Sequence, residues 1–246
     1  MAEEITPMDA YFRKLFGKKN IPSSENKVLE HMKKAEEQRK TSPSAKELEG
    51  FIYVPSINLY LSKEVSHKGK SWNECHEILS KEDAFMPTIY HFKEFLKYMR
   101  ENPNGTNDAS GSEIETILDE ILTVRDPWRA EWLDAKFEKR KDGLYLLTKQ
   151  GSPEKLTDYL DKTRNPGIDL DDWLENANSQ GLPSSKTKDG KLYYYAPVDG
   201  RVARFDADSD GAYLGCDDGV PVSRSDSLGV RRATAEGGSQ KTGGRK

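Results

Sequence analysis

Apolar residues recur with helical spacing between Met86 and Met99. Ile89, Phe92, Leu96 and Met99 fall at i, i+3, i+7 and i+10, which places them on one face of a helix. A face of large apolar side chains is typical of a helix packed on a core, so the pattern predicts a buried helix here.

A second helix is predicted just before it, in "SWNECHEIL". Ser71 is a suitable N-cap, and Trp72, Cys75 and Leu79 form the inner face. His76 and the following His91 are predicted to be surface or capping residues.

Strand patterns flank these helices. "FIYVPSINLYLS", residues 51–62, is rich in Ile, Val and Tyr. Pro55 cannot donate a ladder hydrogen bond, which favours an edge strand or a bulge. Short strands are also predicted at "DGLYLLT", in "GKLYYYAPVDGRVARF" as two strands joined by a turn, and at "SLGVRRA".

The remaining segments predict less regular elements. A third helix is predicted for residues 113–124, and Trp128 and Trp132 after it are predicted to be buried anchors. "SPEKLTDYLDKT" and "DLDDWLENA" predict short helical or turn segments, the latter anchored by Trp173.

These elements predict three parts. Residues 1–49 form a charged helical arm and linker, residues 50–235 an α+β domain, and residues 236–246 a tail without the composition to fold. No apolar run approaches the ~20 residues of a membrane helix, and the first residues are unlike a secretory signal. We therefore expect no direct membrane insertion, and the localisation stays open.

Charge and cysteine content narrow the classes of function. The 246 residues carry a net charge of −4 with acidic and basic residues mixed, which argues against nucleic-acid binding. Cys75 and Cys216 are the only cysteines, and two buried thiols are favoured over a disulfide. No cofactor or metal is predicted, because the histidines and cysteines lack metal-ligand spacing.

"DADSDGAYLGCD" imitates an EF-hand loop, with Asp206, Asp208 and Asp210 before a glycine and Asp217 at the twelfth place. An EF-hand needs a helix on each side. "PVDGRVARF" and "DGVPVSR" contain proline and glycine instead, so an EF-hand is excluded. A calcium site of another geometry stays open.

The same region has an unusual composition. Residues 192–235 contain no Lys, Glu, Gln, Met or Trp, although about a quarter of the chain is of these types and roughly ten would be expected here. Random replacement of adenines in AAC or AAT codons leaves a pyrimidine at the third base. Codons of that form encode fifteen amino acids and exclude these five. The composition therefore points to adenine-directed mutagenesis.

With "RVARF", "AYLGC", a proline and "LGVR" in this order, the segment resembles the variable region of diversity-generating retroelement target proteins of the archaeal type. It is also similar to the formylglycine-generating-enzyme branch of the C-type lectin fold. "FIYVPSINLYLS" and the two helices after it match the upstream part, so the resemblance covers residues 51–233.

The resemblance implies a C-type lectin-like fold with two helices and an irregular antiparallel sheet, and a hypervariable region at about residues 205–227. By strand alternation, Ala212, Leu214 and Cys216 face the core, while Tyr213, Gly215 and Asp217 face outward. Phe205, Ala207, Pro221, Leu228, Gly229 and Val230 are interpreted as framework. The predicted ligand-binding positions are Asp206, Asp208, Asp210, Gly211, Tyr213, Gly215, Asp217, Asp218, Gly219, Val220, Val222, Arg224 and Asp226.

Arg231 is interpreted as framework, its guanidinium held by backbone carbonyls or a carboxylate. Six aspartates against Arg224 among the predicted positions suggest a basic or polar ligand, and Tyr213 is the only aromatic among them.

The function implied is a hypervariable receptor-like protein that binds a protein or another macromolecule. Two alternatives are a calcium-dependent carbohydrate-binding lectin and a formylglycine-generating-type oxidase. Enzymatic activity is not expected, because the cysteines form no evident reactive pair and no Ser-His-Asp order is present. An ordinary solvated loop would also explain the aspartates and glycines.

Overall fold

A computed structural model of the chain describes residues 48–235, all within one unit of the chain. The predicted N-terminal helix and C-terminal tail lie outside the described residues. Four helices are present in this range: α3 (Trp72–Lys81), α4 (Ile89–Glu101), α5 (Gly111–Leu122) and α6 (Leu170–Asn176).

The strands of the described part are β1 (Phe51–Val54), β2 (Leu59–Ser66), β3 (Arg129–Arg140), β4 (Gly143–Leu147), β5 (Glu154–Lys155), β6 (Arg164–Ile168), β7 (Leu192–Tyr195), β8 (Val202–Ala207), β9 (Ala212–Gly215) and β10 (Leu228–Ala235). They form one mixed sheet in the order β1-β2-β10-β3-β8-β9-β7-β6, with β4 paired to β3 and β5 to β4. The protein is therefore α+β, as predicted.

The sheet departs from the predicted antiparallel arrangement at two places. β10 pairs with β3 in parallel, and β7 pairs with β9 in parallel. The two strands of "GKLYYYAPVDGRVARF" exist as β7 and β8, but they do not pair with each other, because β9 lies between them. A local turn signal at residues 198–200 could not reveal this long-range order.

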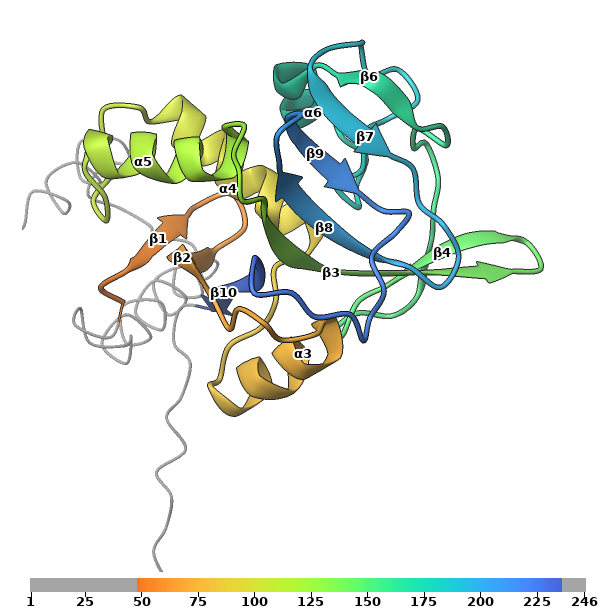
Figure 1. The fold of residues 1–246 in the computed structure, drawn as a ribbon, viewed down its shortest axis with the longest axis horizontal. Helices are drawn as coiled ribbons and strands as arrows, with labels where there is room; N and C mark the ends of the chain where they lie inside the picture. Colours follow the sequence, from red (N-terminus) through yellow and green to blue (C-terminus); the bar gives the residue numbers. More distant parts are fainter. Residues whose placement is uncertain (1–47, 236–246) are drawn as a thin grey trace, which may run out of the picture. The chain divides into compact units, whose positions relative to one another are not determined.

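The two faces of the sheet are covered by different helices (Figure 1). Along β3, Leu133, Ala135 and Phe137 belong to the cluster that contains α4, α5 and α6, whereas Ala130 and Trp132 pack with α3. Strand alternation produces this division, since successive side chains point to opposite faces.

The predicted helices begin and end close to their sequence signals. Ser71 and Thr88 cap α3 and α4, each in a capping box. Ile89, Phe92, Leu96 and Met99 are all fully buried, as predicted from their spacing. The third helix begins two residues earlier than predicted, at Gly111.

Three predictions about individual segments and residues of this framework were also wrong. Residues 51–62 are two strands of a hairpin, and Pro55 lies in the turn between them. "SPEKLTDYLDKT" contains β5 and irregular backbone, with no helix. His76 is buried, because its ring packs edge-on against Trp72 with centroids 4.1 Å apart and its Nε2 lies 3.3 Å from Asp134 Oδ1. His91 does act in the cap of α4, as predicted.

Candidate ligand-binding surface

The predicted binding positions begin on the antiparallel pair of β8 and β9. Asp206 lies opposite Tyr213, and the chain turns between Asp208 and Gly211. Ala212, Leu214 and Cys216 are buried, and Tyr213 and Asp217 are partly exposed on the other side, so the predicted alternation is confirmed for these residues. Strands flank the aspartate loop, which confirms that it is no EF-hand.

Framework residues fix this pair to the helices below it. The ring of Phe205 packs on Phe92 at 4.9 Å and stacks on Trp173 at 6.3 Å between centroids. Ala207, Leu228, Gly229 and Val230 are also buried, as predicted.

Four positions predicted to lie on the binding surface are buried instead: Asp206, Gly211, Gly215 and Gly219. Gly219 packs against backbone, because a Cβ there would lie 2.1 Å from the carbonyl oxygen of Val202. Gly211 has φ +155°, a conformation that disfavours other residues. Gly215 has more room, since the nearest atoms to its ideal Cβ position are 3.6 Å away.

Asp206 is a fully buried carboxylate on β8. Arg204 Nε lies 2.8 Å from its Oδ2 as an ion pair, but neither carboxylate oxygen has a hydrogen-bond partner within residues 48–235. Burial raises the pKa of Asp206 to about 7, against the lowering influence of Arg204 and with a further raising influence of Asp218. The prediction that Asp206 is exposed was wrong, because β8 lies inside the sheet.

Beside this pair the surface is hollowed by about 310 Å³. We name this the acidic hollow and define it by its lining residues: Asn165, Tyr193, Tyr195, Asp208, Asp210, Tyr213, Asp217 and Asp218. Five of these were predicted from the sequence. Asn165 on β6 and the two tyrosines on β7 were missed.

The two missed tyrosines had a sequence signal. Alternation in "LYYY" places Tyr194 inside, where its hydroxyl donates to the Leu160 carbonyl at 2.8 Å, and places Tyr193 and Tyr195 outside. Both also lie within the stretch from Leu192 that lacks five residue types. Asn165 had no signal, because its place beside the hollow depends on the pairing of β6 with β7.

A second hollow of about 330 Å³ adjoins the first, since Asp208 and Tyr213 line both. Its other lining residues are Arg125, Asp126, Trp128, Arg204 and Ser209. The Arg204 guanidinium lies 5.8 Å from the ring centre of Trp128 and also pairs with Asp218 at 2.7 Å. Trp128 is therefore partly exposed at this surface, whereas Trp132 is the buried anchor that was predicted.

The later predicted positions, Val220, Val222, Arg224 and Asp226, do not line either hollow. They lie along the N-terminus of α3, where Arg224 binds Glu74 through two contacts of 2.8 and 2.7 Å. Hydrogen bonds from Ser71, together with Arg224, lower the pKa of Glu74 to about 2. The sequence-predicted positions thus form two groups rather than one.

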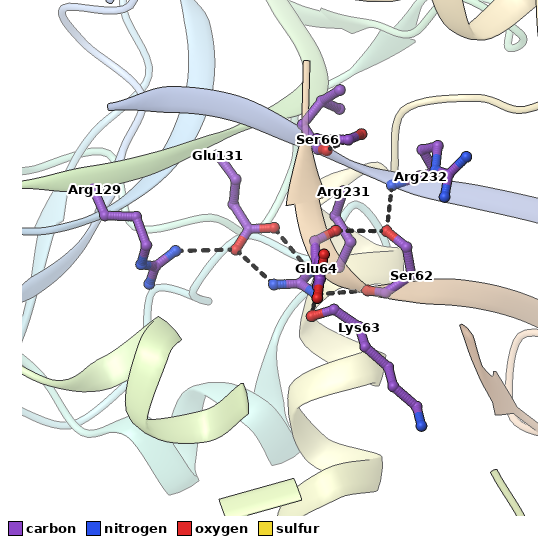
Figure 2. A network of polar contacts seen from close by, with 9 residues as sticks. Ser62, Lys63, Glu64, Ser66, Arg129, Glu131, Arg231 and Arg232 are labelled. Carbon is purple, nitrogen blue, oxygen red and sulfur yellow. Dashed lines mark hydrogen bonds and ion pairs between the residues drawn. The ribbon is translucent and has the colours of Figure 1, made fainter. Parts of the chain in front are cut away.

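Arg231 on β10 is buried in a set of polar contacts that we name the framework network (Figure 2). Its Nε donates to Glu131 Oε2 at 3.0 Å, and a terminal nitrogen donates to the carbonyls of Ser62 and Lys63. Glu131 is fully buried and also contacts Arg129 at 3.4 Å. The predicted anchoring of Arg231 by carbonyls and a carboxylate is confirmed.

Both cysteines are buried free thiols, as predicted. Burial raises the pKa of Cys75 to about 12 and that of Cys216 well above its usual value. They belong to different hydrophobic clusters. Both thiols are therefore interpreted as packing residues.

Two features are absent from residues 48–235. No group of three or more His, Cys, Asp or Glu side chains there is arranged to hold a metal ion. Among the helices of this range, none has the length and apolar character to cross a membrane.

Comparison with known proteins identifies no relative: no family model, no curated protein and no solved structure matches the chain.

Proposed function

We propose that the chain is a hypervariable ligand-binding protein, diversified by a retroelement through adenine-directed mutagenesis and built on a C-type lectin-like scaffold. Its ligand is a protein or another macromolecule, and binding involves no catalysis and no cofactor. The composition of residues 192–235 supports the mechanism of diversification. The order of β1, β2, α3, α4 and the last strands supports the scaffold.

One observation supports the proposal most strongly: the diversified segment is held through its backbone. The carbonyls of Asp208, Gly219 and Pro221 accept hydrogen bonds of 2.9, 2.9 and 3.2 Å from N–H groups of Arg125, Val202 and Asn73. The carbonyls of Ser225 and Ser227 likewise accept hydrogen bonds from the N–H groups of Gly69 at 3.1 Å and Ala130 at 2.9 Å. A carbonyl is present whatever the side chain, so these bonds survive a change of sequence.

Side chains on this backbone are free to differ where they face solvent. Val222 is 69% exposed, and Asp210 and Asp226 are also exposed. Surface substitutions of this kind usually change stability by less than about 0.5 kcal/mol each. The proposal therefore applies to Asp208, Asp210, Asp217, Val222 and Asp226, and to Gly215 for small side chains, but not to Asp206, Gly211 or Gly219.

A combined variant tests this division. Asp208→Asn, Asp210→Ser, Asp217→Asn, Val222→Thr and Asp226→Ser together should lower the melting temperature by no more than about 5 °C, with unfolding still cooperative. Gly215→Ala should be similarly mild, whereas Gly219→Ala should cost about 1–3 kcal/mol because its Cβ meets fixed backbone.

Collapse of the combined variant, or a Gly219→Ala protein as stable as the parent, would contradict the proposal. A genomic observation tests the mechanism separately. A nearby reverse transcriptase gene with a template repeat that differs from this segment only at adenines is expected.

The calcium-dependent lectin is the alternative: four aspartates line the acidic hollow, but no three of them are arranged to hold a metal ion together. It predicts a melting temperature raised by calcium chloride and restored by EDTA. The oxidase is not proposed, because Cys75 and Cys216 pack in separate clusters.

A further inference from the structure

Three tyrosine rings stand together on the exposed face of β7 and β9. The parallel register places Tyr193 beside Tyr213, and the rings of Tyr195 and Tyr213 meet edge to face with centroids 5.5 Å apart. Tyr193 also lies against Gly211, whose ideal Cβ position is 3.1 Å from its Cε2. The acidic hollow thus has an aromatic wall in which the rings of Tyr195 and Tyr213 support each other.

Negative charge surrounds this wall. Of the four aspartates that line the hollow, Asp218 pairs with Arg204 at 2.7 Å. Asp208, Asp210 and Asp217 form no ion pair with a lysine or arginine anywhere in residues 48–235. Burial and the neighbouring charge of Asp218 raise the pKa of Asp217, which shows that its negative charge is disfavoured in the free protein.

A further carboxylate lies behind the aromatic wall. Asp206 is fully buried and its Oδ2 forms an ion pair with Arg204 Nε at 2.8 Å. The ideal Cβ position of Gly215 is 3.6 Å from both Asp206 Oδ2 and the ring of Tyr213, so the carboxylate and the ring share one side of β9. A carboxylate that is paired with Arg204 therefore lies beneath the rings, and aspartates without an ion-pair partner among the described residues lie around them.

Aromatic faces and carboxylates together favour an organic cation as the ligand. The face of a tyrosine ring attracts a cation, and the attraction grows when water is excluded. The ring also contacts alkyl groups on the cation, which a carboxylate alone cannot do. An inorganic ion lacks such groups, and a neutral side chain lacks the charge.

From these contacts we infer that the acidic hollow binds an alkylammonium group, that of a lysine side chain or its N-methylated form on the partner macromolecule. Tyr193, Tyr195 and Tyr213 contact its carbon atoms, and Asp208, Asp210 and Asp217 neutralise its charge. This inference rests on the proposed function and specifies the ligand chemistry of this surface.

The test is a titration with small probes followed by NMR. Nα-acetyl-lysine methylamide and its Nε-trimethyl form are the charged probes, and the Nε-acetyl form is the matched neutral probe. The charged probes should shift the signals of β7 and β9 and bind at least tenfold more tightly than the neutral probe. Their binding should weaken as salt is added.

Variants locate the site. Tyr195→Leu and Asp217→Asn should each weaken binding of the trimethyl probe at least fivefold. Tyr145→Leu and Asp171→Asn are matched controls, since these residues do not line the hollow, and they should leave binding unchanged.

Equal binding of charged and neutral probes would overturn the inference, as would no binding at all, or equal losses in the control variants. Calcium chloride that shifts the same signals and displaces the trimethyl probe at equal concentration would also overturn it, in favour of a metal site. If the probes fail while the combined variant described above still folds, the alkylammonium site falls and the proposed function stands.

Discussion

Two fully buried carboxylates on adjacent strands have very different surroundings. Glu131 on β3 is bound by Arg231 at 3.0 and 3.3 Å and contacts Arg129. Asp206 on β8, the register partner of Ala130, has one ion pair to Arg204, an arginine that it shares with exposed Asp218. The first carboxylate joins three strands, whereas the second lies under a surface open to solvent.

The two carboxylates therefore have different roles in the fold. The Arg231 guanidinium is bound by Glu131 and by two backbone carbonyls, whereas Nε and Nη2 of Arg129 have no hydrogen-bond partner among the described residues. The pair of Glu131 and Arg231 contributes to one defined arrangement of β2, β3 and β10. The Asp206 carboxylate has one ion-pair partner, Arg204, and burial raises the pKa of Asp206 to about 7. A buried charge with too few partners is tolerated only because the rest of the sheet stabilises the fold. Such charges are typical of functional sites rather than of structural cores.

The largest effect is expected from breaking the framework network. Arg231→Met should lower the free energy of unfolding by about 3–5 kcal/mol, because it leaves Glu131 buried with an incomplete partner. Urea unfolding measures this. Arg140→Met, which removes the exposed pair with Glu138, is the control and should cost less than about 1 kcal/mol. Equal losses in the two variants would show that the buried pair of Arg231 and Glu131 contributes no more to stability than an exposed ion pair.

An intermediate effect is expected from Asp206→Asn, and it depends on pH. The pKa of Asp206 is higher in the folded than in the unfolded chain, so the folded state binds the proton more tightly. Its contribution to stability is therefore present below about pH 4 and is lost as the pH rises to about 7. Relative to the parent, Asp206→Asn should gain up to about 4 kcal/mol between pH 4 and pH 8.

Arg204, Asp218 and Tyr213 face Asp206 and contribute to this titration. Urea unfolding of parent and variant at each pH measures the difference, in which shared groups cancel. A difference that stays constant with pH would mean that Asp206 is ionised throughout the range.

The smallest effect is expected at the second group of predicted positions. Arg224→Ala removes an exposed pair with Glu74, and the melting temperature should fall by less than about 3 °C. Glu74→Ala should cost more, because that carboxylate also accepts from the Ser71 N–H and hydroxyl in the cap of α3. Similar losses in both variants would mark Arg224 as a structural residue.

Local sequence patterns correctly predicted the features that depend on residues close together in the chain. The cap at Ser71, the buried face from Ile89 to Met99 and the alternation of Ala212, Leu214 and Cys216 follow from local residue type and spacing. The anchoring of Arg231 was also predicted, because a guanidinium in a closing strand needs several acceptors.

The features that the sequence could not reveal depend on pairing between strands that are far apart in the chain. The local sequence around Asp206 is typical of a polar loop. Its burial follows only from the position of β8 between β3 and β9. Asn165 joins the hollow only through β6 and β7, and Gly219 is fixed by the approach of Val202. These residues depend on segments far apart in the chain, whose order in the sheet no local signal specifies.

The position of β10 between β2 and β3 bears on synthesis of the protein. During translation residues 205–227 leave the ribosome before this strand, and without the strand β2 and β3 have no common neighbour. A chain that ended before Leu228 would therefore leave β2 and β3 with open edges, which are prone to pair with other chains. Only a chain translated through residue 235 would complete the sheet beside residues 205–227.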